Sequence, residues 1–87
     1  MTDRNLEKAA EFAPLIESVH GEHHPELTRV REITEELMAA PTDSRPLFSE
    51  LRAVTNNYAI PNDVCETFEA VYRALSRADA ASSAAVS

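Results

Sequence analysis

The chain contains a single glycine, Gly21, and five prolines that divide it into stretches rich in Ala, Leu, Glu and Arg. These residue types favour helices, whereas β-sandwiches and barrels depend on many short strands and glycine-rich turns. Apolar residues within each stretch recur every three or four positions, which is the spacing of one face of an α-helix. The sequence therefore predicts an all-α fold.

Four helices are expected, at about residues 3–19, 25–40, 46–57 and 62–79. Pro14 lies inside the first, where we expect a kink rather than an end, because the apolar stripe continues through it. Gly21 is expected to end this helix with a positive φ angle. Residues suited to first turns and caps then begin the other three. These are Pro25, Pro46, either Asp43 or Ser44, and Asn62.

Short connections between the four segments favour antiparallel neighbours. We therefore expect residues 1–80 to form one small antiparallel up-down-up-down four-helix bundle, and residues 81–87, which lack anchoring groups, to form a flexible C-terminal tail. A core of this size is thin. Self-association, for example as a homodimer, would add burial.

Fifteen acidic residues against eight basic ones give a formal charge of −7, which disfavours binding to nucleic acid. No stretch approaches the roughly 20 apolar residues that cross a membrane. The N-terminus has no basic segment followed by an apolar one, and the single cysteine, Cys65, fits a reducing compartment. These features predict a cytoplasmic protein.

The densest polar cluster comprises His20, Glu22, His23 and His24. Imidazoles beside a carboxylate are ligands for iron or zinc. Adjacent residues on a helix point about 100° apart, however, and His23 and His24 lie near a turn. We therefore expect turn and capping roles and no cofactor within one chain, and we leave open a metal site shared between chains.

Cys65 follows the expected cap of the last helix, where the helix dipole lowers a thiol pKa. Its position on the apolar stripe with Phe68 and Tyr72 favours a small buried core residue instead. The acidic residues of the second helix are expected on a solvated face, paired with Arg29 and Arg31. No Ser/His/Asp set, glycine-rich phosphate loop or paired-cysteine motif is present, so we predict that the chain is not an enzyme.

Two segments together resemble a known family. The first is VHGEHHPEL at residues 19–27, continuing to Glu35-Glu36-Leu37. The second is LRAVTNNY at residues 51–58, followed by Pro61, Cys65, Thr67, Tyr72 and Leu75. They resemble the "VHG-x-x-HPEL" and "LR-x-LTN-x-Y…P-x-x-AC-x-T…LY-x-x-L" segments of the hemerythrin-like domain of iron–sulfur cluster repair di-iron proteins. The matches occur in family order and cover most of residues 6–76.

This resemblance implies a four-helix bundle whose family members hold two irons through histidines and glutamates. The expected ligand positions are missing: the chain starts about where the first ligand would stand, shortens at residues 38–45, and stops before the fourth-helix motif. In an antiparallel bundle those helix ends lie together, so the resemblance implies a truncated domain without its metal-ligand half. His20 then inherits a junction role, and Cys65 inherits no catalytic role.

Three functions follow as hypotheses. The first is a non-catalytic interaction or regulatory module that binds itself or another protein. The second is a metal-binding or redox-stress protein whose site forms between chains from the cluster at residues 20–24. The third is a small thiol sensor that acts through Cys65.

Overall fold

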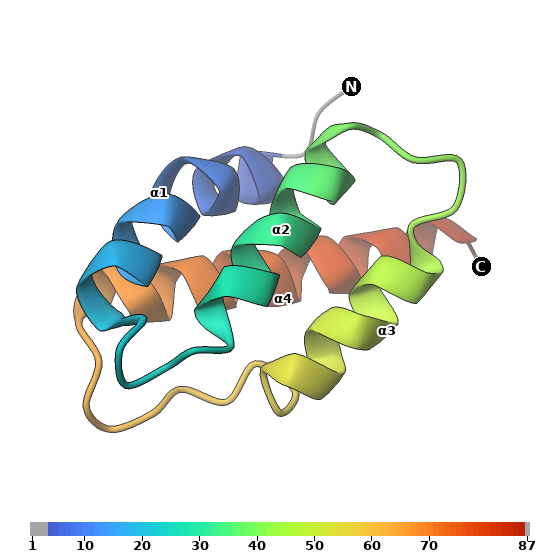
Figure 1. Ribbon diagram of the computed structural model, residues 1–87. Helices are drawn as coiled ribbons and strands as arrows, with labels where there is room; N and C mark the ends of the chain where they lie inside the picture. Colours follow the sequence, from blue (N-terminus) through green and yellow to red (C-terminus); the bar gives the residue numbers. More distant parts are fainter. Residues whose placement is uncertain (1–3, 87) are drawn as a thin grey trace.

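The computed structural model describes residues 4–86, which contain four α-helices and no strand. Helix α1 comprises Arg4–His20, α2 Leu27–Met38, α3 Arg45–Val54 and α4 Glu66–Val86. Successive helices run in opposite directions, and α1 packs against both α2 and α4 while α3 packs against α2 (Figure 1). The predicted all-α antiparallel four-helix bundle is confirmed.

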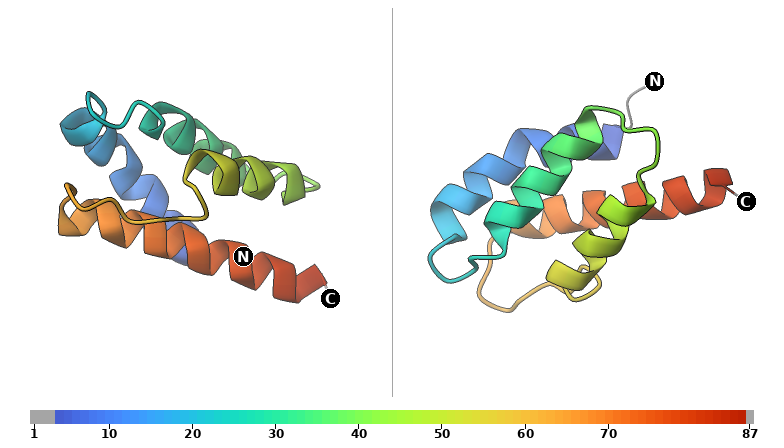
Figure 2. Two further views of the ribbon diagram at one scale, coloured as in Figure 1. Left: turned by 90° about the horizontal axis from the view of Figure 1, so that it is seen from below. Right: turned by 45° about the vertical axis from the view of Figure 1, so that its right-hand side comes forward.

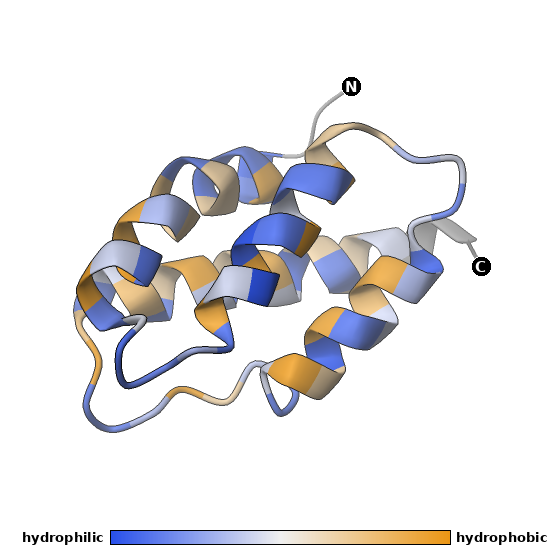
Figure 3. Ribbon diagram, viewed as in Figure 1, coloured by the Kyte–Doolittle hydropathy of each residue, from blue (hydrophilic) through white to orange (hydrophobic). Residues whose placement is uncertain are grey.

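The core lies where the apolar stripes of the helices meet (Figure 3). Its largest fully buried apolar side chains are Ile16 from α1, Leu27, Val30 and Ile33 from α2, Leu51 from α3, and Phe68, Val71, Tyr72 and Leu75 from α4. Two large apolar residues of α1 lie outside the core, on the side of the helix that faces away from α2 and α4. Leu15 is 51% exposed and Val19 is 64% exposed.

Helix α1 continues through Pro14, so the proline does not end the helix, and it lies on the exposed face. Gly21 has no positive φ angle, so the predicted left-handed cap is wrong. Its N–H donates to the Glu17 carbonyl at 2.8 Å, and a Cβ atom on residue 21 would lie 2.4 Å from that oxygen. Glycine is required here because the turn closes too tightly for a side chain.

The end of α3 also differs from the prediction, because the helix stops at Val54 and not at Asn57. Asn56, Asn57 and Tyr58 all have φ angles between 54° and 63°, which forms a short left-handed turn. The Asn57 N–H closes this turn on the Arg52 carbonyl at 2.8 Å. Asparagine tolerates this conformation better than most residues, so the Asn-Asn pair is suited to the turn.

A polar network then ties this turn to α4. Arg52 donates to both oxygens of Asp79 at 2.8 and 2.9 Å, and the Tyr58 hydroxyl donates to Asp79 at 2.8 Å. Thr55 closes the turn locally, because its hydroxyl donates to the Leu51 carbonyl and accepts the N–H of Tyr58. Asp79 is only 6% exposed, so its charge is stabilised mainly by these two partners.

Both predicted ends of the last helix are corrected. Asn62 lies in the preceding loop, and the helix begins at Glu66. The helix continues to Val86, although the sequence predicts an end near Asp79 and a tail over residues 81–87, of which Ser87 lies outside the described residues. Alanine has the highest helix propensity, which explains why the alanine-rich segment continues the helix. No helix within residues 4–86 is long and apolar enough to span a membrane.

Candidate functional site

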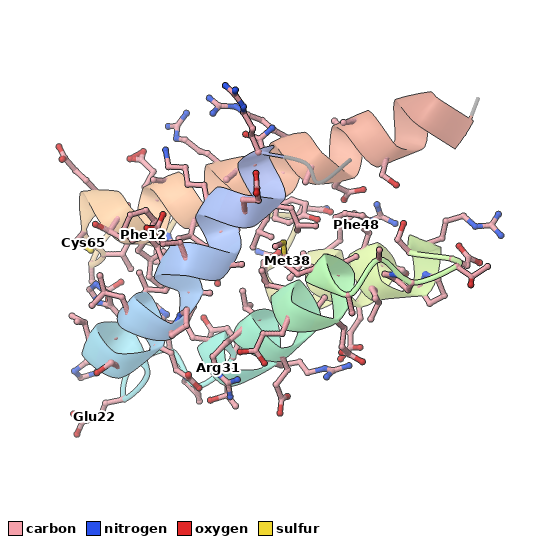
Figure 4. All side chains as sticks on the ribbon, turned by 90° about the horizontal axis from the view of Figure 1, so that it is seen from above. Phe12, Glu22, Arg31, Met38, Phe48 and Cys65 are labelled. Atoms are coloured by element: carbon pink, nitrogen blue, oxygen red, sulfur yellow. The ribbon has the colours of Figure 1, made fainter. Side chains whose placement is uncertain are left out.

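Cys65 occupies the N-cap position of α4, and its carbonyl accepts the first helical hydrogen bond from the Glu69 N–H at 3.1 Å. The residue is exposed, so the prediction of a buried core cysteine is wrong. The reason is the start of the helix: the stripe of α4 begins inside the helix at Phe68, and Cys65 precedes its first turn. Figure 4 shows Cys65 at this end of α4.

The surroundings of the thiol lower its pKa to about 7. The largest cause is a hydrogen bond from the backbone N–H of Phe68, followed by the hydrogen bond with the side chain of His20; the N–H of Thr67 contributes less. Both backbone donors belong to the first turn of α4, where N–H groups have no helical partner. The thiol of Cys65 is therefore partly ionised at neutral pH.

His20 is the last residue of α1, and its Nε2 lies 3.2 Å from the Cys65 Sγ. The imidazole is held edge-on against Phe68, with ring centroids 5.5 Å apart. Sequence reasoning considered both residues separately and missed the pair. One signal was available, because the end of a first helix and the start of a fourth meet at the same end of an antiparallel bundle.

His24 connects the α1–α2 turn to the loop before α4. Its Nδ1 lies 3.2 Å from Glu26, and its Nε2 lies 3.1 Å from Asp63. The hydrogen bond with His24 is the main reason that the pKa of Asp63 is lowered. The ring is also edge-on to Phe68, at 5.3 Å. This half-buried imidazole therefore has a clear structural role.

The four predicted metal-site residues do not converge. His20 and His24 lie against Phe68 with the partners described above, whereas Glu22 and His23 are exposed. Glu22 extends away from the bundle (Figure 4). Within residues 4–86, no three His, Cys, Asp or Glu side chains come together as a metal-ligand group. His24 instead links the α1–α2 turn to the loop before α4 through Glu26 and Asp63.

The predicted solvated face of α2 is confirmed and extended. Arg31 pairs with Glu35 on the same helix at 3.1 Å, and its Nε donates to Glu17 of α1 at 2.6 Å. Arg29 makes a two-pronged pair with Glu50 of α3, at 2.6 and 2.7 Å, and this pair raises the pKa of the Arg29 guanidinium. These arginines therefore link α2 to both of its neighbours.

The opposite end of the bundle carries an open groove of about 380 Å³, hereafter the end groove. It is formed where α1 and α3 begin, where α2 ends, and along the last turns of α4. Its lining includes Leu6, Met38, Pro41, Phe48, Ala78 and Ala81, and none of the lining residues that the structure describes is charged. Met38 and Phe48 lie at this end of α2 and α3 (Figure 4), and the final turns of α4 extend past the start of α1 (Figure 2).

The two ends thus offer different chemistry. One end presents an ionisable thiol beside an imidazole, which suits nucleophilic or redox chemistry. The other presents an uncharged hollow on a chain of charge −7, which suits the binding of an apolar surface. Comparison with known protein families, curated proteins and solved structures gives no significant match.

Proposed function

We propose that this chain is a non-catalytic interaction module, related to the hemerythrin-like domains of iron–sulfur cluster repair proteins, and that the end groove is its binding surface. The groove is the observation that carries the proposal. It lies at the bundle end where the resemblance places the ligand positions of the family. An end that in the related domains would hold metal ligands here offers an uncharged surface instead.

The proposed occupant of the groove is a second copy of the chain. The last turns of α4 line the groove with Ala78, Ala81 and Ser82, and these small side chains allow another helix to approach closely. A two-fold axis would pair the same segment of both copies, which closes the assembly at two chains. Because the described lining residues are all uncharged, two acidic chains can meet there without burying a carboxylate from this lining.

Sedimentation velocity over a range of protein concentrations tests this assignment with two matched variants. Ala81→Glu places a carboxylate in the groove, and we expect it to weaken dimerisation at least tenfold. Ala80→Glu adds the same charge at an exposed neighbouring position outside the groove lining, and we expect it to dimerise like the parent protein. A parent protein that stays monomeric, or equal weakening by both variants, would reject the groove as a self-association surface.

A second candidate function is a thiol sensor, and the pairing of Cys65 with His20 favours it. Peroxide oxidises a thiolate to a sulfenic acid and is itself reduced to water. Mass spectrometry with a sulfenic-acid trapping reagent tests this reaction. We expect rapid trapping in the parent protein and slower trapping in His20→Ala, with Cys65→Ser as the blank. Equal rates for the folded and urea-unfolded parent protein would argue against a sensor role.

The alternative to the groove proposal is a metal site shared between chains, at the end of the bundle that carries His20 and Cys65. His20 and Cys65 offer two ligand atoms 3.2 Å apart, and the exposed Glu22 and His23 lie in the adjoining turn, with His24 beyond. Native mass spectrometry of untagged protein with added zinc or iron reports chain number and metal content together. Under this alternative, replacing His23 and His24 with alanine abolishes metal uptake. Unchanged uptake would reject that ligand assignment.

A further inference from the structure

One stripe along α1 carries exposed basic and apolar side chains. A helix turns by about 100° per residue, so five residues of α1 lie within about 40° of the direction of Lys8: Arg4, Lys8, Phe12, Leu15 and Val19. Leu15 is 51% exposed and Val19 is 64% exposed, while Phe12 is half-buried at the edge of the core. Arg4 and Lys8 are exposed. The stripe is therefore basic where the helix begins and apolar toward its end.

The positive charges of this stripe are not used inside the molecule. Five of the chain's eight basic residues form ion pairs with carboxylates: Arg29, Arg31, Arg45, Arg52 and Arg73. The other three, Arg4, Lys8 and Arg77, make no hydrogen bond or ion pair with any residue in the range 4–86. The nearest acids of the helix, Glu7 and Glu11, are turned about 100° and 60° away from Lys8. Three positive charges thus remain available to a partner.

Helix α4 brings the third of these charges to the same level. The two helices are antiparallel neighbours, and the contact of His20 with Cys65 sets their register at one end. Twelve residues back from His20 lies Lys8, and twelve residues on from Cys65 lies Arg77. Equal steps along antiparallel helices reach about the same level, so Lys8 and Arg77 are neighbours across the two helices. Figure 4 shows nitrogen-tipped side chains projecting from this part of α1 and α4, on the side away from α2.

We propose that this outer face of α1 and α4 binds an acidic amphipathic helix of another protein. Apolar side chains of the partner pack on Leu15 and Val19, and its carboxylates pair with Lys8 and Arg77. The stripe from Arg4 to Val19 is about 23 Å long, so a partner helix of about 15–18 residues covers it. None of these five residues lines the end groove, so this is a second surface, beyond the function proposed above.

The distribution of charge favours a short helix over other anionic occupants. A bilayer or a nucleic-acid duplex is an extended negative surface, which the rest of a chain of charge −7 repels. A short acidic helix meets only the basic face, because charges more than about 10 Å away are screened at about 0.1 M salt. A second copy offers the acidic face of α2, but Glu35 and Glu36 are already paired there with Arg31 and Arg29.

Fluorescence anisotropy with a labelled synthetic helix tests the proposal. The probe has about 18 residues, with leucine on one face and glutamate on the other. We expect saturable binding to the full chain that weakens with added sodium chloride, because salt screens the ion pairs. A scrambled peptide of the same composition keeps the charge and loses the apolar face, so it should bind at least fivefold more weakly. Equal binding of the two peptides, or no binding of either, would overturn the proposal.

Matched variants locate the binding face. Lys8→Gln, Arg77→Gln and Leu15→Ser are each expected to weaken binding of the amphipathic peptide at least threefold. All three positions are exposed, so the fold should be retained, as circular dichroism can verify. Arg45→Gln removes the same charge from the start of α3 and should leave the affinity unchanged. Equal weakening by Arg45→Gln and Lys8→Gln would overturn the proposal, because it would show that only the overall charge matters.

Two further measurements test the other occupants of this face. We expect no co-sedimentation of the protein with vesicles of equal parts phosphatidylserine and phosphatidylcholine; co-sedimentation that Lys8→Gln abolishes would replace the partner helix by a lipid surface. In sedimentation velocity, Lys8→Gln should self-associate like the parent protein. Loss of self-association in Lys8→Gln, with Ala81→Glu still dimeric, would identify a second copy as the occupant and overturn the proposal.

Discussion

At the scale of single residues, Cys65 shows how one helical position decides between a buried side chain and a reactive one. The residue has the apolar spacing of the stripe on α4, but it precedes the first helical residue. At that position the thiol receives N–H groups that no carbonyl of the helix uses. The imidazole of His20 then adds a partner from the other end of the chain.

The thiol pKa gives a prediction for the pH dependence of alkylation. Only the thiolate reacts, so the rate of iodoacetamide labelling of native protein should rise with a midpoint near pH 7. His20→Ala should move that midpoint upward. The shift should be partial, because the N–H of Phe68 is the larger cause of the lowered pKa.

The lowered pKa of the Cys65 thiol also makes the stability of the fold depend on pH. A thiol whose pKa is lowered on folding stabilises the folded state at pH values above its unfolded pKa, and this contribution is lost as the pH falls through about 7. Labelling in urea supplies the reference, with a midpoint of about 8.5. Identical midpoints in native and urea-unfolded protein would contradict the described environment of Cys65.

Gly21 gives a second prediction at this scale. A methyl group there would collide with the Glu17 carbonyl, so Gly21→Ala should lower the free energy of unfolding by about 1–3 kcal/mol in urea denaturation. Glu22→Ala, at the exposed next position, is the control and should change it by less than about 0.5 kcal/mol. Equal effects of the two variants would show that the tight turn is not the cause.

At the scale of elements, α3 is joined to α4 through a polar network rather than through a long helix–helix interface. The left-handed turn at residues 56–58 places Tyr58 so that its hydroxyl reaches Asp79, and Arg52 reaches the same carboxylate from α3. Residues 51–58 therefore contribute to the shape of the bundle, because they hold α3 against α4.

Because Asp79 accepts from both Arg52 and Tyr58, replacing this one residue should destabilise the fold strongly. Asp79→Asn should lower the free energy of unfolding by about 2–3 kcal/mol, because a buried charge-assisted set of hydrogen bonds is broken. Glu69→Gln, in the exposed pair with Arg73, should cost less than about 0.5 kcal/mol. In a double-mutant cycle, Tyr58→Phe should lower the free energy of unfolding much less in the Asp79→Asn background than in the parent protein. Additive effects of the two substitutions would show that Tyr58 and Asp79 do not act together.

At the scale of the whole molecule, the two ends of the bundle carry different surfaces, and the charge of −7 acts on both. Two acidic copies repel each other across the solvent even where the surfaces that meet are uncharged. Salt reduces this repulsion, because the Debye length falls from about 30 Å at 0.01 M to about 10 Å at 0.1 M.

The proposed dimer should therefore tighten as salt is added. Measured by sedimentation velocity, its dissociation constant should fall as sodium chloride rises from about 0.01 M to about 0.15 M. An interface held by ion pairs would behave in the opposite way and weaken. A dissociation constant that rises with salt would therefore exclude the uncharged groove as the interface.

Much of the fold was predictable, because helical periodicity is a local property of the chain. Helix α1 was expected over residues 3–19 and spans Arg4–His20. Helix ends were less predictable where competing signals exist, as at Asn62, which is a good cap residue but lies in the loop before α4. Of the candidate site, the residues at 20–24 and Cys65 were identified individually, but the pairing of His20 with Cys65 was not.

The sequence by itself determined the helical class, the order and antiparallel arrangement of the helices, and the acidic charge, because propensity, period and composition act over a few residues. Only the tertiary structure decided which polar groups meet. The pairs His20–Cys65 and Arg52–Asp79 join residues 45 and 27 positions apart, and the packing leaves the Tyr72 hydroxyl without a partner among the described residues. Distances between residues so far apart in the chain depend on how the whole bundle closes, which local patterns do not encode.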